Sequence, residues 1–261
     1  GDAAKHAETG QPVTLGRSEK MSKSKKNVVD PEAIIGAYGA DTARLFMLSD
    51  SPPDRDLEWT DAGVDGAWRY LNRLWRLVTE NPAPLAAADA ARPETISTAA
   101  EEVLKATHKT IDGVSADLEK FHFNKAVARI RELTNAVEGL KDTAPDANWV
   151  RRFALETLSL LIAPMTPHLA EALWLELGHE DTLVADTAWP VADPTYLVDD
   201  LVTIAVQVNG KLRGTIELLK DCAKDAAEDA ALALDKVQSV LEGKPPRKVI
   251  VVPNRIVNVV A

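Results

Sequence analysis

The spacing of apolar residues changes once along this 261-residue chain, near residue 200. From Asp61 to Leu177, apolar residues recur every three or four positions, as they do on one face of an α-helix. From Val202 onward they alternate with polar residues, as in a strand that buries one face. One segment cannot satisfy both periods, so we predict a helical part followed by a smaller part that contains a sheet.

The helical part is expected to form an up-and-down bundle of four apolar-striped helices. The predicted ranges are 61–80, 94–118, 124–140 and 147–177, with a Pro/Ala-rich connection between the first two. Pro164 should interrupt the last helix, and Thr166-Pro167 should restart it. The residues expected on the buried face of the first helix are Val64, Trp68, Leu71, Trp75 and Val78.

The tail is expected to form a β-β-α-β-β module. Alternation from Val202 to Ile216 is broken at Asn209-Gly210, a strong signal for a two-residue hairpin turn. A helix is predicted from Asp221 to a stop at Gly243, and two strands at 249–252 and 256–260. The residues expected to share the buried face of that helix are Ala230, Leu234, Val237 and Leu241.

A basic segment, RSEKMSKSKK, runs from Arg17 to Lys26 and places five cations against one anion, Glu19. The whole chain carries a net charge of −10, so this segment stands out. It has little to bury beyond Met21, and we expect an exposed loop that contacts a polyanion. A merely solvated basic loop or a targeting signal is the alternative.

The order of residues inside this loop is more specific than its charge. Lys20 to Ser24 read KMSKS, the second signature of the class I aminoacyl-tRNA synthetases, and the segment continues as KMSKSKKNVVDP. YGADTARLFML (38–48), LEW (57–59) and LLIAPMTPHLAEALW (160–174) are also similar to this family. The tail segments VQVNGKLRGTIEL (206–218) and RKVIVVPNRIVNVV (247–260) resemble bacterial-type leucyl-tRNA synthetases in particular. Lys26 departs from many relatives, which carry Asn there.

This resemblance implies a mainly α fold with three parts. Residues 1–60 would be the KMSKS-loop end of a Rossmann-type catalytic domain, and residues 61–198 an anticodon-binding-type helical bundle. Residues 199–261 would be a small C-terminal tRNA-binding domain. None of the five histidines lies in a HIGH-type context, so the first ATP motif is expected in another part of a longer enzyme. The amino-acid pocket and editing domain are expected there too, and the chain alone should be inactive.

The implied activity is that of a leucine–tRNA ligase, which activates leucine with ATP and transfers it to leucine tRNA. By resemblance, Lys20 and Lys23 are the catalytic residues, and Lys20, Met21, Ser22, Lys23 and Ser24 bind ATP. Met21 would anchor the loop in an apolar notch, and the serines would set its bends. Mg²⁺ would accompany ATP in the full enzyme, with no metal bound by this portion.

Basic residues in the tail and bundle are candidates for tRNA contact. Residues 201–261 hold nine Lys/Arg against seven Asp/Glu, a net of +2, which leaves −12 for residues 1–200. Lys211 and Arg213 should share the solvent face of a strand, with Leu212 on the other face. Solvated charged faces are the alternative for each. The candidates are Lys211, Arg213, Arg247, Lys248 and Arg255 in the tail and Arg69, Arg73 and Arg76 in the bundle.

The GADTARLF segment is expected to play a supporting role. Asp41 can cap the helix that follows Gly39, and Asp41 and Arg44 can pair or brace the loop. Met165, His168 and Trp174 are expected to be packing residues.

Two other classes of protein stay open at this point. One is a non-catalytic tRNA-binding or scaffold protein derived from a synthetase; the other is a valyl-, isoleucyl- or methionyl-tRNA synthetase. The single cysteine, Cys222, fits a reducing compartment, and no run approaches the length of a membrane helix. We expect a cytoplasmic monomer without membrane contact.

Overall fold

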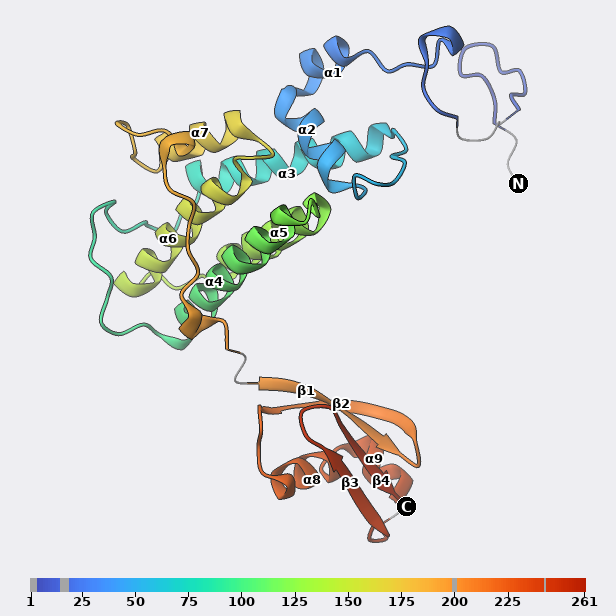
Figure 1. Cartoon of the computed structure of the whole chain (residues 1–261), viewed down its shortest axis with the longest axis vertical. Coiled ribbons are helices and arrows are strands. Elements are labelled where there is room, and N and C mark those ends of the chain that lie inside the picture. The colour runs from blue at the N-terminus through green and yellow to red at the C-terminus, as the bar shows by residue number, and fades with distance from the viewer. Residues whose placement is uncertain (1–3, 15–18, 199–200, 242) are drawn as a thin grey trace. The chain divides into compact units, whose positions relative to one another are not determined.

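The computed structural model describes residues 4–14, 19–198, 201–241 and 243–261. Arg17 of the basic segment, and Asp199 at the start of the expected third part, lie outside these residues. The chain divides into two compact units, Gly1–Asp193 and Pro194–Ala261 (Figure 1). Within the described residues, we find no helix long and apolar enough to cross a membrane.

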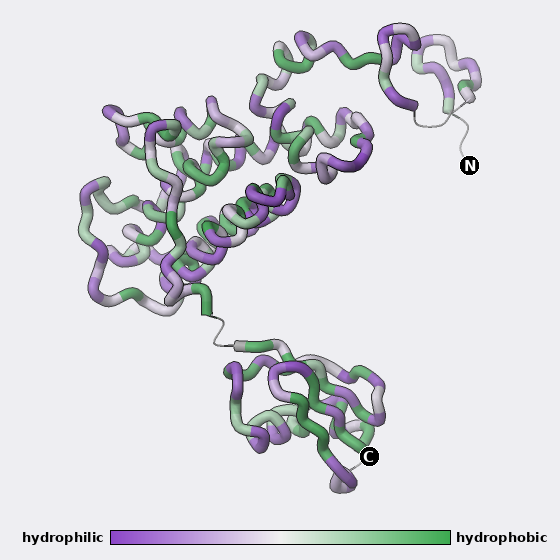
Figure 2. Tube along the Cα trace, viewed as in Figure 1, coloured by the Kyte–Doolittle hydropathy of each residue, from purple (hydrophilic) through white to green (hydrophobic). Residues whose placement is uncertain are grey.

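The first unit is helical, as its apolar spacing predicted. The short helix η1 (Lys23–Lys25) precedes the helices α1 (Pro31–Tyr38), α2 (Ala40–Ser49), α3 (Asp61–Thr79), α4 (Thr98–Glu119), α5 (Phe123–Gly139), α6 (Pro145–Ile162) and α7 (Pro167–Glu176). The 3₁₀ turn η2 (Val184–Asp186) follows α7. Helix α4 packs against both α5 and α6 and forms the centre of the bundle. Hydrophilic and hydrophobic residues alternate along the turns of these helices (Figure 2), which is how each buries one stripe and leaves the other in water.

Capping residues and prolines mark the ends of several helices. Asp30 caps α1 by accepting a hydrogen bond from the backbone N of Glu32 at 3.0 Å, and Pro31 takes the first helical position. Gly39, at φ 84°, ends α1, a conformation that glycine adopts without steric cost. Thr166 and Pro167 restart the chain as α7 after the break at Pro164. The predicted restart at Thr166-Pro167 is confirmed.

The predicted buried face of α3 is right at Val64 and Leu71 and wrong at Trp68. Trp68 is 44% exposed, and the buried residues of the helix are Val64, Ala67, Tyr70, Leu71, Leu74 and Leu77. Both sets recur every three or four residues, so spacing alone did not separate two neighbouring faces of the helix. The smaller Ala67 lies where the helices meet, and the large indole of Trp68 stays at the surface.

The second unit is a sheet with two helices on one face. The short helix η3 (Pro194–Tyr196) precedes strands β1 (Leu201–Val208) and β2 (Lys211–Leu219), helices α8 (Lys224–Leu232) and α9 (Asp235–Leu241), and strands β3 (Lys248–Val252) and β4 (Ile256–Val260). The strand order is β2-β1-β4-β3, with β1 and β4 parallel and the other pairs antiparallel. Asn209 and Gly210 both have positive φ, 48° and 79°, as the predicted two-residue hairpin requires.

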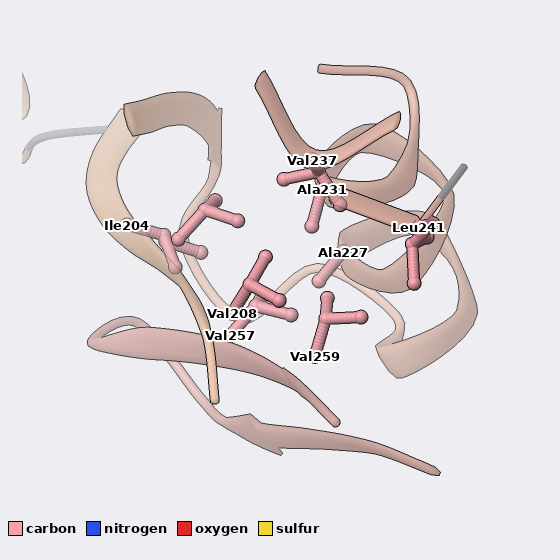
Figure 3. Close-up of a cluster of buried hydrophobic side chains, with 9 residues drawn as sticks. Ile204, Val208, Ala227, Ala231, Val237, Leu241, Val257 and Val259 are labelled. Atoms are coloured by element: carbon pink, nitrogen blue, oxygen red, sulfur yellow. The ribbon is translucent and has the colours of Figure 1, made fainter. Parts of the chain in front are cut away.

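Side chains from α8 and α9 point toward those from β1 and β4 and form the core of this unit (Figure 3). The predicted single helix is in fact two, with the break after Leu232. The break changes which alanines are buried: Ala227 and Ala231 lie in the core, whereas the predicted Ala230 is only half-buried. Val237 and Leu241 are buried as predicted.

Candidate functional site

The KMSKS loop folds around Ser22. The Ser22 hydroxyl accepts a hydrogen bond from the backbone N of Lys25 at 3.3 Å, and the Ser22 backbone N donates to Asn27 Oδ1 at 2.9 Å. The hydroxyl groups of Ser22 and Ser24 lie 3.2 Å apart. Lys26 closes the turn with φ 53°, a left-handed conformation that Asn or Gly adopts more easily. Ser22 therefore sets the bend of this loop, as expected from the sequence.

The lysines of the loop differ in their surroundings. Lys25 Nζ lies 2.7 Å from Glu19 Oε2, in an ion pair that joins the two ends of the basic segment. Lys20 and Lys23 are exposed, and neither forms an ion pair within the described part of the loop or elsewhere in the described chain. The two lysines that the resemblance marks as catalytic thus keep ammonium groups available to a ligand, as does Lys26, which is also exposed and has no ion pair among the described residues. The sequence reasoning did not assign Glu19 this role, although a lone anion in a basic run is a signal for it.

A hollow of about 780 Å³ lies beside this loop and separates it from α2 and the LEW segment. We call it the loop hollow. Met21 contributes to one wall and is 42% exposed, so the expected apolar notch encloses it only in part. The residues that line the loop hollow are Glu19, Lys20, Met21, Asn27, Met47, Asp56, Leu57, Glu58 and Trp59.

Helix α2 is held against the bundle by a pair of charged contacts, which we call the α2 clamp. Asp41, 8% exposed, accepts hydrogen bonds from the backbone N of Leu169 at 2.7 Å and from His168 Nδ1 at 3.0 Å. Arg44, one turn further along, donates to the backbone oxygens of Pro164 at 2.8 Å and Met165 at 2.9 Å. The carboxylate meets the positive end of α7 and the guanidinium meets the negative end of α6, so both helix dipoles are complemented.

This clamp corrects several expectations. Gly39, not Asp41, occupies the N-cap of α2; Asp41 binds the first turn of α7, and Arg44 binds the α6–α7 turn. The supporting role predicted for this segment is confirmed, but through contacts to a distant part of the chain. His168 has a side chain that is 78% exposed, so it is no packing residue, whereas Met165 and Trp174 are buried.

The predicted placement of Lys211 and Arg213 on one solvent face is wrong. Val206 pairs with Gly214 and Gln207 with Leu212, so Arg213 is an extra residue in a β-bulge. The bulge reverses the alternation, and Leu212 is 63% exposed while Arg213 is half-buried. Lys211 is exposed at the hairpin end of β2.

The strand register brings three of the five tail cations to one end of the sheet. Lys211 pairs with Val208 at the end of β1, and Lys248 pairs with Val260 at the end of β4, which runs parallel to β1. Arg247 immediately precedes Lys248 and is exposed. Arg255 lies in the β3–β4 turn, at the opposite end of the sheet. We call Lys211, Arg247 and Lys248 the basic end of the second unit.

The three arginines of α3 do not form one free basic stripe. Arg73 Nε donates to Glu138 Oε1 at 2.7 Å, and its Nη2 contacts Glu138 Oε2 and Asn135 Oδ1. This contact raises the pKa of Arg73 and lowers the pKa of Glu138. Arg73 therefore joins α3 to α5, and Arg69 and Arg76 are the exposed members of the set.

Among the residues that the structure describes, no group of three or more His, Cys, Asp or Glu side chains is arranged to hold a metal ion. The charged groups that could meet a polyanion are instead cations: the free lysines of the loop, the basic end, and Arg69 and Arg76. These cations could bind a polyanion and stabilise negative charge on it.

Two family models match the chain. Residues 13–60 match the class I tRNA synthetases (I, L, M and V), and residues 100–228 match the anticodon-binding domain of tRNA ligase. The first match contains the KMSKS loop, α1 and α2, and the second runs from α4 across the division between the two units.

Curated relatives and a solved structure agree with these models. The chain is 64% identical to a leucine–tRNA ligase of Paramagnetospirillum magneticum, over 98% of this chain and 29% of that protein. It is 58% identical to a leucine–tRNA ligase of Rhodospirillum rubrum, over 96% of this chain and 29% of that protein. The agnB2 LeuRS of Agrobacterium radiobacter, crystallised in a ternary complex with tRNA and LeuAMS, is 32% identical with a TM-score of 0.71. That likeness covers 92% of this chain and 31% of the other.

The chain thus spans about three tenths of the length of the ligases it matches. Its matches include the KMSKS segment, the helical bundle and the tail, the same segments that resembled leucyl enzymes in the sequence. The chain belongs to the class I tRNA synthetase family and matches the C-terminal part of the bacterial leucine–tRNA ligases.

Proposed function

We propose that this chain supplies the KMSKS half of the ATP site and a tRNA-binding surface to a leucine–tRNA ligase. The observation that carries the proposal is the KMSKS loop itself, in which Lys20 and Lys23 are exposed and form no ion pair with any described residue, while Lys25 is held by Glu19. The leucine pocket would lie in parts of the ligase outside this chain. The enzyme would act in the cytoplasm as a monomer, with Mg²⁺ entering the site together with ATP.

The chemistry needs cations at the phosphates. A carboxylate oxygen of leucine attacks the α-phosphorus of ATP, and the bond to the bridging oxygen of pyrophosphate breaks. Negative charge grows on the phosphate oxygens as this happens. An ammonium group that meets this charge in the transition state lowers the barrier, and the flexible stem of lysine can follow the phosphate as its geometry changes. Lys23 is the residue we assign to direct contact, with Lys20 beside it.

Substitution of Lys23 by Ala in the full-length ligase tests this assignment. Leucine-dependent ATP–pyrophosphate exchange should fall by about 10²-fold, the usual effect of removing one group that stabilises transition-state charge. Lys26→Asn is the matched control, because it removes one charge from the same loop at a left-handed position that Asn tolerates. An exchange rate in Lys23→Ala equal to that of Lys26→Asn would refute the role of Lys23.

The tRNA surface would include the basic end of the second unit. Lys211, Arg247 and Lys248 are exposed there, and helical RNA is recognised largely through its backbone and shape. Replacing all three by Ala should weaken binding of leucine tRNA and reduce the slope of log K against log salt by up to about 3. A slope equal to that of the wild-type protein would remove this end from the tRNA surface.

A further inference from the structure

The turn between α4 and α5 contains a phenylalanine where a glycine is usual. After α4 ends, His122 N donates to Asp117 O at 2.8 Å and Phe121 N donates to Leu118 O at 3.0 Å. This pair of hydrogen bonds is the Schellman closure, whose left-handed residue is most often glycine because a Cβ is strained there. Here Phe121 occupies that position, with φ 57°.

Packing around Phe121 offsets little of that backbone strain. Its side chain is 65% exposed, and its ring meets the ring of Phe123 edge to face, with centroids 5.9 Å apart and planes at 83°. A residue that is both strained and exposed does not stabilise the isolated fold through burial. Such outliers concentrate where a side chain serves a ligand or partner.

The charge around Phe121 indicates the partner's chemistry. From Asp117 to Arg131 the chain holds four Lys/Arg against two Asp/Glu, a net of +2 in a protein of net charge −10. Lys120 and Lys125, one position before and four positions after Phe121 in the chain, are exposed, and no ion pair to either is present in the part of the chain that the structure describes. We call Lys120, Phe121 and Lys125 the turn patch.

The turn that carries the patch is joined to α5 by an ion pair. Arg129 Nε donates to Asp117 Oδ2 at 2.8 Å, which ties α5 to the end of α4. Arg129 lies so close over Gly113 that a Cβ there would come within 2.8 Å of its guanidinium carbon. The patch also lies beside α2, because Phe46 and Ser49 of α2 and Asn124 of α5 line one hollow of about 300 Å³.

We propose that an unpaired base of tRNA stacks on Phe121 while Lys120 and Lys125 contact the flanking phosphates. Unpaired bases stack on exposed aromatic rings, and cations beside the ring hold the backbone that carries them. A protein partner is a poorer fit, because the exposed ring of Phe121 is flanked in the chain by Lys120 and Lys125, for which the described residues provide no ion pair. The proposal rests on the proposed function in one respect, that the RNA is a tRNA.

Two substitutions of Phe121 in the full-length ligase separate binding from folding. Phe121→Gly should weaken binding of a leucine tRNA transcript about tenfold, since it removes one stacking partner. The same change should leave the unfolding temperature equal or raise it, because glycine fits the left-handed position. Phe121→Trp keeps an aromatic face and should bind within about threefold of wild type. Leu175→Ala, which trims another exposed apolar side chain, is the matched control and should change neither quantity.

The outcomes are distinct. Unchanged tRNA binding in Phe121→Gly, or an equal loss in Phe121→Trp, overturns the stacking role. A lower unfolding temperature in Phe121→Gly also overturns it, since Phe121 would then be a packing residue. Leucylation by the wild-type protein is measured in the same preparations and tests the proposed function separately. If wild type fails to charge leucine tRNA yet binds RNA through Phe121, the proposed function fails and the turn patch stands.

Discussion

Asp41 should be the carboxylate on which the position of α2 depends most. It is 8% exposed and accepts two hydrogen bonds from the start of α7, at 2.7 Å from Leu169 N and 3.0 Å from His168 Nδ1. A hydrogen bond to a charged group contributes about 1.5–3 kcal/mol, and a carboxylate at a helix N-terminus adds about 0.3–2 kcal/mol. Because such contributions overlap, we expect Asp41→Ala to lower the free energy of unfolding of the first unit by about 2–4 kcal/mol.

Asp41→Asn should cost less, about 1–2 kcal/mol, because the amide oxygen can still accept from Leu169 N while the charge is lost. All six tryptophans lie within residues 1–193, so urea unfolding followed by tryptophan fluorescence reports the first unit alone. Asp112→Ala, at an exposed position of α4, is the matched control and should change stability by less than about 0.5 kcal/mol. If Asp41→Ala behaves like Asp112→Ala, the reasoning about the α2 clamp is wrong.

Two further predictions concern the packing of the bundle. Gly63→Ala should destabilise the first unit by about 1–3 kcal/mol, because its Cβ would lie 2.5 Å from the ring of buried Phe46. At Gly66, one turn later in α3, an added Cβ would meet nothing within 4 Å, so Gly66→Ala should stabilise the first unit by about 0.5–1 kcal/mol. If urea unfolding shows that both substitutions change the stability in the same direction, the packing argument for Gly63 is wrong. Burial lowers the pKa of His108 below its usual 6.5, so the folded state favours the neutral ring. The stability that this provides is complete above pH 6.5 and should decline as the pH falls below it, and His108→Gln should remove this part of the pH dependence of the unfolding temperature.

Features fixed by neighbouring residues could be predicted from the sequence. The cap at Asp30, the stop at Gly39 and the Asn209-Gly210 hairpin each depend on the backbone preferences of two or three adjacent residues. The exposure of the KMSKS lysines could also be predicted from neighbouring residues, because a loop with few apolar residues to bury leaves its charges at the surface. At these positions, the amino-acid type and its immediate neighbours determine the backbone conformation.

Features fixed by distant residues could not be predicted in this way. Asp41 and Leu169 are 128 positions apart, and the apolar spacing in neither segment predicts their contact. The bulge at Arg213 was missed because an extra residue in a strand leaves the composition unchanged while reversing which side chains face the core. Phe121 was missed because a Schellman closure is normally recognised by its glycine.

Helix α2 connects the loop hollow with the bundle, because one end of the helix contacts the bundle and the other end lines the hollow. Asp41, near its start, binds the first turn of α7, Arg44 binds the α6–α7 turn, and Met47, near its end, lines the loop hollow. An α-helix rises about 1.5 Å per residue and does not stretch, so the six positions from Asp41 to Met47 fix a separation of about 9 Å. The ring of Phe46 also meets Trp59 of the LEW segment edge to face, with centroids 5.1 Å apart. The wall of the loop hollow is therefore set by charged contacts at the ends of α6 and α7, and Asp41→Asn in the full-length ligase should raise the KM for ATP without removing any group that touches the nucleotide.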